Sequence, residues 1–117
     1  MKSKIFKIVD TKENRARLDL FIDWGAFLTD HSVETIETLK EENLTHESMK
    51  LYRHQEVFFI WCSSEVQAGA DQKPSNQTRP INRVHKKLWQ QLEKELSSDG
   101  LPAGAALEQI LYTFSVE

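Results

Sequence analysis

The second half of the chain carries a strand–helix–strand pattern that restricts the folds open to it. Residues 56–64 (EVFFIWCSS) and 107–116 (LEQILYTFSV) are rich in the aromatic and β-branched residues that favour strands. Between them, residues 81–96 (INRVHKKLWQQLEKEL) repeat apolar side chains every three or four positions, as one face of a helix does. Because both faces of segment 56–64 are apolar, we expect it to lie at the centre of a sheet that is covered on both sides.

The first half of the chain repeats this order of elements. Residues 4–9 (KIFKIV) suit a short strand, and apolar positions at helical spacing follow through residues 11–42, with a break expected between 25 and 32. Residues 47–53 (ESMKLYR) alternate between two faces, as a strand does. A short connection then joins this strand to segment 56–64, which predicts an antiparallel hairpin.

A strand–helix–strand order that occurs twice is the order of a ferredoxin-like α+β fold. It predicts one domain, residues 1–117, with a four-stranded antiparallel βαββαβ sheet and two helices on one face. The other face would then carry part of the apolar surface of segment 56–64. Each large apolar side chain left in water forfeits about 1.5–3 kcal/mol. We therefore expect a homodimer in which the open faces of two sheets meet.

The composition argues against several kinds of partner. The net charge is −3, from 18 acidic and 15 basic residues without a basic block, which predicts no nucleic-acid partner. No apolar run reaches the length of a membrane span, and no secretory signal is apparent. Cys62, the one cysteine, excludes an intrachain disulfide and lies in an apolar strand, where we expect a buried, inert thiol. These features predict a cytoplasmic protein without a membrane partner.

Three segments carry a resemblance to a known group of proteins. They are the hairpin ESMKLYRHQEVFFIWCSSEV, the helix start RPINRVHKKLWQQL and the closing LEQILYTFSVE. With them the chain resembles the dimeric α+β barrel superfamily and, within it, a group of small proteins of unknown function. That group shares a helix start Pro-Ile-x-x-Val/Tyr-His-x-Lys/Arg, which reads here from Pro80 to Lys87 and includes His85. The resemblance implies the ferredoxin-like fold and a dimer, and no particular reaction.

The layout of the chain is also similar to that of the L-rhamnose mutarotases, which share this fold. The first helix of those proteins offers a histidine followed shortly by Trp-Pro-Glu. The matching stretch here, residues 18–28, has Trp24 but neither a histidine nor a proline. The resemblance therefore implies the fold of a mutarotase without its catalytic motif.

His85 is the main candidate for chemistry. Helical spacing places it beside Ile81 and Leu88 on the apolar stripe that faces the sheet. An imidazole in that place could act as a general base, a general acid or a ligand, since its ordinary pKa lies near 6.5. The alternative is a buried histidine with a purely structural hydrogen bond.

Four further residues are candidates for ligand binding. Tyr52, Trp61 and Tyr112 belong to three different predicted strands and could line one cavity with His85. The alternative is that these aromatic residues belong to an ordinary core or to a dimer interface. Arg53, at the hairpin turn, could bind an anionic ligand at the rim or be a solvated turn residue.

The motifs of several enzyme classes are missing. The sequence contains no H-E-x-x-H or C-x-x-C pair, no G-x-S-x-G, no P-loop and no G-x-G-x-x-G, so it predicts no metal site and names no cofactor. Residues 67–80 form a long polar loop, either a pocket lid or a mobile surface loop. Two hypotheses about function remain: a small-molecule-binding protein or enzyme with a pocket around His85, or a non-catalytic homodimeric interaction domain.

Overall fold

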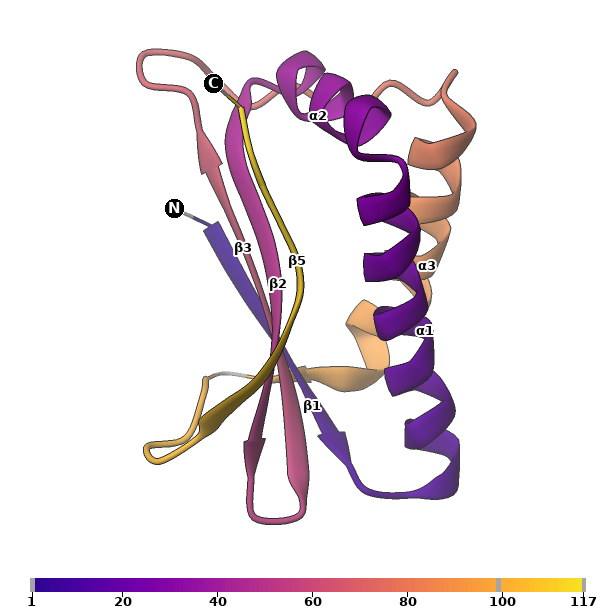
Figure 1. The fold of residues 1–117 in the computed structure, drawn as a ribbon, viewed down its shortest axis with the longest axis vertical. Helices are drawn as coiled ribbons and strands as arrows, with labels where there is room; N and C mark the ends of the chain where they lie inside the picture. The colour runs from indigo at the N-terminus through magenta and orange to yellow at the C-terminus, as the bar shows by residue number, and fades with distance from the viewer. Residues whose placement is uncertain (1, 99, 117) are drawn as a thin grey trace.

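Three helices cover one face of an antiparallel sheet in the computed structural model, which describes residues 2–98 and 100–116, with the backbone alone for residues 91–97 (Figure 1). The elements are, in chain order, β1 (Lys2–Val9), α1 (Lys12–Asp30), α2 (Ser32–Glu41), β2 (Leu44–His54), β3 (Val57–Val66), α3 (Pro80–Leu96), β4 (Ser97–Ser98) and β5 (Ala106–Ser115). The predicted α+β class is thus confirmed.

The strands lie in the order β4-β1-β3-β2-β5. β3 is therefore central, as its two apolar faces predicted, and it pairs antiparallel with β1 on one side and β2 on the other. β2 and β3 form the predicted hairpin, whose turn includes Gln55 at a φ of 56°. Four strands are long, and β4 consists of two residues.

The position of the last strand differs from a ferredoxin-like sheet, in which it lies beside the first. Only β4 takes that place, through the pairs Ile5↔Ser98 and Phe6↔Ser97. The following residues 100–105 (GLPAGA) are rich in glycine and include a proline, and such residues do not continue a ladder. The chain then passes the side of the sheet away from the helices, and β5 pairs with β2 at the opposite edge (Figure 1). The ferredoxin-like order is thus present only in part.

The long helical stretch breaks where the sequence predicted a break. α1 ends at Asp30, His31 takes a non-helical conformation with φ −114° and ψ 42°, and α2 starts at Ser32. The backbone N–H of His31 donates to the carbonyl oxygen of Leu28 at 3.2 Å, and the hydroxyl of Thr35 lies 3.1 Å from the same oxygen and 2.9 Å from the carbonyl oxygen of His31. The result is three helices in place of the expected two.

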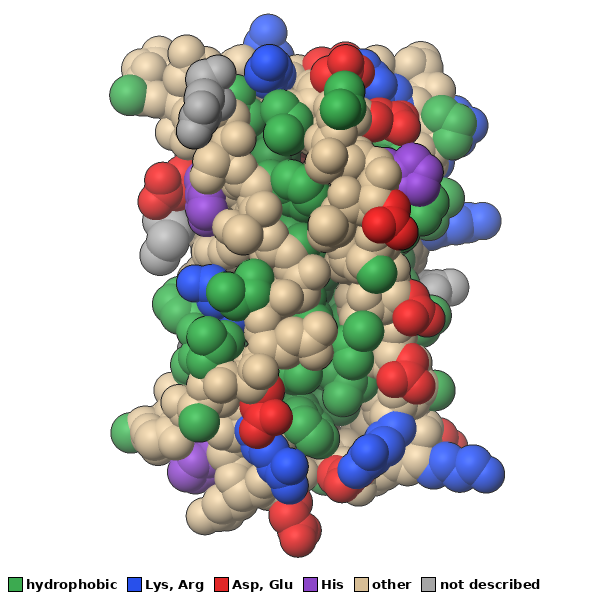
Figure 2. All heavy atoms as spheres, viewed as in Figure 1, with side chains coloured by type: hydrophobic (Ala, Val, Ile, Leu, Met, Phe, Trp, Pro, Cys, Tyr) green, Lys and Arg blue, Asp and Glu red, His purple; other side chains and the backbone are tan. Residues whose placement is uncertain are grey.

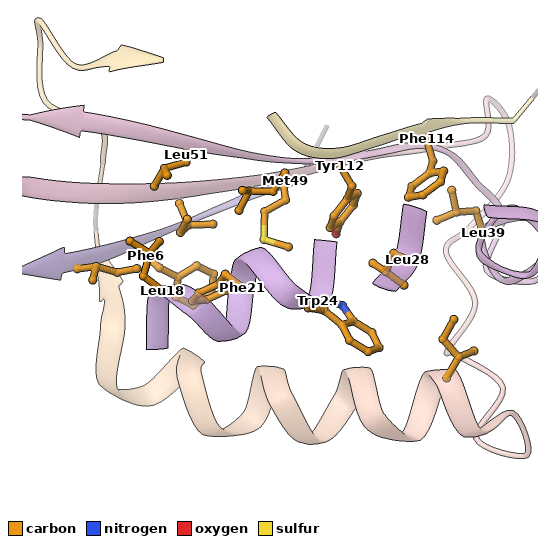
Figure 3. Packing of buried hydrophobic residues seen from close by; sticks show 14 of the residues in the cluster. Phe6, Leu18, Phe21, Trp24, Leu28, Leu39, Met49, Leu51, Tyr112 and Phe114 are labelled. Carbon is orange, nitrogen blue, oxygen red and sulfur yellow. The ribbon is translucent and has the colours of Figure 1, made fainter. Parts of the chain in front are cut away.

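The hydrophobic core lies between the sheet and the helices (Figure 3). Phe6, Phe21, Met49 and Ile60 have no exposed surface. The ring of Trp89 lies 5.1 Å from that of Phe6 and 5.9 Å from that of Phe21. From the side, hydrophobic side chains follow the seam between β5 and α1, while many charged side chains lie at its two ends and on the outer side of the helices (Figure 2).

Gly25 allows α1 to approach β5 closely. A Cβ atom at this position would lie 2.7 Å from the carbonyl oxygen of Leu111, a backbone atom that cannot turn aside. Glycine inside a helix costs about 1 kcal/mol relative to alanine. The close contact explains why a glycine stands in the middle of the apolar stripe.

The opposite face of the sheet carries the alternate residues of β3. Phe59 and Trp61 lie there, because Ile60 between them belongs to the core on the helical side. Phe59 is nonetheless only 5% exposed, with Lys7 and Tyr52 as its cross-strand neighbours. The expectation that only a second subunit could cover this face was therefore too strong.

Candidate functional site

Two adjoining hollows lie between the sheet and the helices, at the end of the molecule where α2 packs. One has a volume of about 80 Å³ and extends toward α1, where Trp24 lines it. The other has a volume of about 560 Å³ and extends along β1 and β3, where Lys4 and Cys62 line it. Glu42, Glu47 and His85 border both hollows, so these three side chains form the centre of the candidate site.

Glu47 is a carboxylic acid on the core face of β2. It shares that face with Met49 and Leu51, which are fully or almost fully buried. The hydroxyl of Tyr112, from β5, donates to Oε1 of Glu47 at 2.6 Å. Burial raises the pKa of Glu47 above its ordinary value, and the hydrogen bond from Tyr112 opposes the rise. Glu47 therefore holds its proton to a higher pH than an exposed glutamate does.

Glu42 follows the last residue of α2. Burial, and after it the nearby charges of Glu47 and Glu41, raise the pKa of Glu42 to about 7. The negative end of the α2 dipole lies at the same place and also disfavours a carboxylate. A carboxyl group with a pKa near neutrality is suited to take up and release protons.

His85 is held by a tryptophan from another helix. The indole Nε1–H of Trp24, on α1, donates to Nδ1 of His85 at 2.8 Å. Burial lowers the pKa of His85 to about 4, so the imidazole is neutral at pH 7. An indole nitrogen can only donate, so Nδ1 must accept, and the proton of the neutral ring lies on Nε2.

The thiol of Cys62 lies on the wall of the larger hollow. Burial, together with the charge of Glu47, raises its pKa far above the ordinary value, so the thiol stays protonated. A protonated thiol is a poor nucleophile, which agrees with the inert cysteine that the sequence predicted.

The loop between β3 and α3 borders both hollows, through Gln72 on the larger and Ser75 on the smaller. The amide of Lys73 donates to the carbonyl oxygen of Glu42 at 3.0 Å, and the ammonium of Lys2 donates to Oε1 of Gln72 at 2.7 Å. The loop is thus tied to the end of α2 and to β1 beside the site.

Arg79 fastens the end of this loop to α2. Its Nε lies 2.9 Å from Oε1 of Glu41, and its two terminal nitrogens lie 3.5 Å and 3.7 Å from carboxylate oxygens of Glu37 and Glu34. Glu34 and Glu37, one helical turn apart on α2, thus share one guanidinium. These exposed ion pairs position the start of α3. Ile81, the second residue of the motif at the start of this helix, is buried.

The structure brings together only part of the predicted set of site residues. His85 and Tyr112 both border the larger hollow. Tyr52 and Trp61 lie on the opposite face of the sheet, with their rings 6.0 Å apart. Each is the sequence neighbour of a core residue in its strand, so its side chain points to the other side. The expectation that these aromatic residues line one cavity with His85 therefore fails for Tyr52 and Trp61.

Arg53 lies apart from the site, at the hairpin end of β2. Its guanidinium carbon lies 5.4 Å from the ring centre of Phe58, and its Nε donates to the carbonyl oxygen of Gln55 at 2.8 Å. These contacts belong to the turn itself.

The sequence reasoning missed three members of the site. Glu47 carried a usable signal, since it has the same strand parity as Met49 and Leu51 and so stands on the apolar face of its strand. Glu42 gave no such signal in a run of charged residues. Trp24 pairs with a residue 61 positions away, which no local pattern can indicate.

The described residues give no indication of a metal centre or a membrane span. Among residues 2–98 and 100–116, no group of three or more His, Cys, Asp or Glu side chains is arranged to hold a metal ion. Within the same ranges, no helix has both the length and the apolar character needed to cross a membrane.

Fold and site together define a small α+β protein with an acid-lined cleft between its sheet and its helices. The chain belongs to a family of unknown function (DUF6176), whose family model matches residues 4–102. No curated protein and no solved structure matches the chain.

Proposed function

We propose that this protein binds a small polar molecule in the larger hollow, in contact with Glu42, Glu47 and His85. The observation that carries the proposal is the convergence of these three side chains, from the end of α2, from β2 and from α3, where the two hollows meet. A volume of about 560 Å³ lies within the range of small-molecule sites. Burial shifts the pKa of all three groups, and such shifts cluster at functional sites.

The chemistry of the site supports proton transfer to or from the bound molecule. Glu42 is the group suited to exchange a proton near neutral pH. The neutral ring of His85 offers a hydrogen-bond donor beside it, and Glu47 offers a second carboxyl group whose pKa burial raises. The proposal therefore includes an enzyme that moves a proton, with Glu42 as the acid or base.

Stability alone does not account for this arrangement. A polar group moved from water into the core costs free energy unless its hydrogen bonds are fully restored. Glu47 receives one hydrogen bond from Tyr112, and among the described residues the carboxyl group of Glu42 has no hydrogen-bond donor. Apolar residues in the places of Glu42 and Glu47 would give a fold that is at least as stable. The presence of these two acids therefore favours a role in binding.

A matched pair of tyrosine variants tests the proposal. A library of small metabolites is screened by the rise in Tm of the wild-type protein, and hits are measured again with Tyr112→Phe and with Tyr52→Phe. Both substitutions remove one hydroxyl, from the cleft and from the opposite face of the sheet respectively. We expect hits whose affinity falls in Tyr112→Phe and not in Tyr52→Phe. Hits that respond to Tyr52→Phe alone would place the binding site elsewhere.

A homodimer of the dimeric α+β barrel type is the second candidate, and the open face of the sheet supports it. Val9, Ile110 and Leu107 are 46%, 51% and 51% exposed there. The indole N–H of Trp61, on the same face, is buried without a partner among the described residues. Sedimentation of the wild type and of Ile110→Lys tests this candidate, which predicts a dimer that the lysine weakens. A wild type that sediments as a monomer at all concentrations would contradict it.

A further inference from the structure

We infer that Trp24 fixes His85 as a hydrogen-bond donor to the ligand, and that the ligand is a small carbonyl compound. The inference rests on the proposed function and adds two things to it, a positioning residue and the chemical class of the ligand. It starts from the 2.8 Å hydrogen bond between the two side chains.

The direction of this hydrogen bond decides which nitrogen of His85 holds the proton. Tryptophan has a donor and no acceptor, so the lone pair of Nδ1 is occupied by the indole N–H. The proton of the neutral imidazole is therefore on Nε2. With Nδ1 occupied and Nε2 protonated, His85 has no free lone pair for a proton or a metal ion, and its remaining polar atom is a donor.

Packing on both sides holds the imidazole in this orientation. Trp24 is 7% exposed and stacks on Phe27, with ring centres 5.3 Å apart and an interplanar angle of 13°. On its other side, His85 contacts Trp89 with ring centres 5.5 Å apart. The donor group is thus preorganised, which reduces the entropy cost of binding a ligand.

The Nε2–H group is available to a ligand. Within the described part of the chain, the side chain of His85 makes no hydrogen bond other than the one with Trp24. The ring borders both hollows, and Nε2 does not occur among the fully buried polar atoms that lack a partner. The N–H group therefore keeps exposed surface and a free hydrogen-bonding capacity on a residue of the cleft wall.

A carbonyl oxygen fits the groups that surround this space. It accepts hydrogen bonds, and the Nε2–H group of His85 supplies a donor whose position Trp24 fixes on the wall of the hollow. The competing class of ligand is a cation such as an ammonium group. A cation would pair with Glu42 and Glu47 as carboxylates, but it needs hydrogen-bond acceptors, and His85 presents a donor. A neutral imidazole with its proton on Nε2 therefore favours the carbonyl.

The first test reads the position of the proton without any ligand. Long-range ¹H–¹⁵N NMR spectra of the full chain distinguish a protonated from an unprotonated ring nitrogen. We expect Nε2 of His85 to be protonated and Nδ1 unprotonated from pH 8 to pH 5. A proton on Nδ1, or a charged ring in that range, overturns the inference even if every variant fails to fold.

Two tryptophan variants test the role of Trp24. Trp24→Phe keeps an aromatic ring and removes the N–H donor, so we expect the ¹⁵N shifts of His85 to move toward a mixture of both tautomers. Trp61→Phe is the matched control, since it removes an indole N–H on the opposite face of the sheet that has no partner within the described part of the chain. Unchanged ¹⁵N shifts in Trp24→Phe overturn the positioning role.

The second test compares two probes of the same shape, cyclohexanone and cyclohexylamine. We expect the ketone to shift the Nε2–H resonance of wild-type His85 and to bind about fivefold more weakly to Trp24→Phe, the effect of one hydrogen bond. Binding of the amine alone overturns the carbonyl class and leaves the proposed binding site standing. If neither probe shifts any resonance of the cleft, both the inference and the proposed small-molecule site are overturned.

Discussion

The space between α1 and the sheet holds an apolar region and a region with polar groups, called here its apolar end and its polar end. At one end Phe6, Phe21 and Met49 are fully buried, and the rings of Phe6 and Phe21 lie 5.5 Å apart. At the other end Trp24 and Tyr112 direct their polar atoms to His85 and Glu47, and the two hollows lie among them. The same helix and the same sheet build both ends.

The change from one end to the other takes place within a few residues. On α1 it falls between Phe21 and Trp24, less than one helical turn apart, and on β2 between Met49 and Glu47, the next residue on the same face. Short distances in sequence thus separate a region that stabilises the fold from one that presents chemistry. Changes in side-chain packing should therefore affect stability mainly at the apolar end, and changes in protonation should affect it mainly at the polar end.

The largest expected effect is at the apolar end. Phe21→Ala should lower the free energy of unfolding by about 3–5 kcal/mol, through lost apolar burial and the cavity that remains. Phe27→Ala, the same change on the same helix at a side chain that is 41% exposed, is the control and should cost much less. Urea unfolding measures both. Equal losses would show that the apolar end is not the main source of stability.

The next effect is a pH dependence at the polar end. Burial lowers the folded-state pKa of His85 from 6.5 to about 4, so between these values the unfolded chain binds a proton that the folded chain does not. Stability should therefore fall as the pH is lowered from 6.5 to 4, by about 3 kcal/mol from this group. His85→Asn lacks this contribution, so the difference in unfolding free energy between wild type and variant should change with pH across the window. Parallel pH curves would mean that His85 is not buried and neutral.

A third effect concerns the contact that holds α1 against β5 between the two ends. Gly25→Ala places a methyl group against the carbonyl of Leu111 and should destabilise the protein by about 1–3 kcal/mol, although alanine favours the helix. Gly100→Ala is the control, because a Cβ atom there has no neighbour within 4 Å. Thermal unfolding of both variants measures the difference. A stabilised Gly25→Ala would show that α1 and β5 are less closely packed.

The pair of Glu47 and Tyr112 sharpens the contrast. Tyr112→Phe alone removes the hydrogen bond to a buried acid and should cost about 1–3 kcal/mol. The double variant Tyr112→Phe with Glu47→Met replaces both partners by apolar groups, and its stability should return to within about 1 kcal/mol of the wild type. Urea unfolding measures all three proteins. A double variant that is less stable than the single one would mean that the polar pair serves the fold.

The effect expected at Glu42 has the opposite sign to that of His85, and it is the smallest because water screens the charge of this half-buried side chain. The pKa of Glu42 rises from 4.5 to about 7 in the folded state, which therefore keeps a proton that the unfolded state has lost between these values. Its contribution is fully present below pH 4.5 and is lost as the pH rises to 7. Glu42→Gln should thus gain stability relative to the wild type from pH 5 to pH 8. Glu65→Gln, at an exposed glutamate, is the control and should show no such trend.

Much of the fold follows from local patterns in the sequence. The two apolar faces of β3 indicated its central place, and the residues around His31 indicated the break between α1 and α2. The sequence did not indicate the edge of the sheet at which β5 pairs, because an alternating strand fits the free edge of β1 as well as that of β2. That choice depends on the path of residues 100–105, which no periodicity describes.

The candidate site could be predicted only in part. The inward position of His85 followed from helical spacing, and Tyr112 was named because it is an aromatic residue of the last strand. Trp24 could not be found as its partner, because the contact joins two helices that meet only in the folded chain. Strand parity places Tyr52 with Lys50, on the face away from Met49 and Leu51, and the same parity would have added Glu47 to the site.

The three indole N–H resonances of the protein report on both faces of the sheet at once. Trp24 and Trp89 border the hollows, whereas Trp61 lies on the opposite face. In a titration of the ¹⁵N-labelled wild type with small polar compounds, a ligand of the cleft should shift the resonances of Trp24 and Trp89 and leave that of Trp61 in place. Compounds that shift Trp61 alone, or that shift none of the three across a broad library, would contradict the assignment of the acid-lined cleft as a binding site.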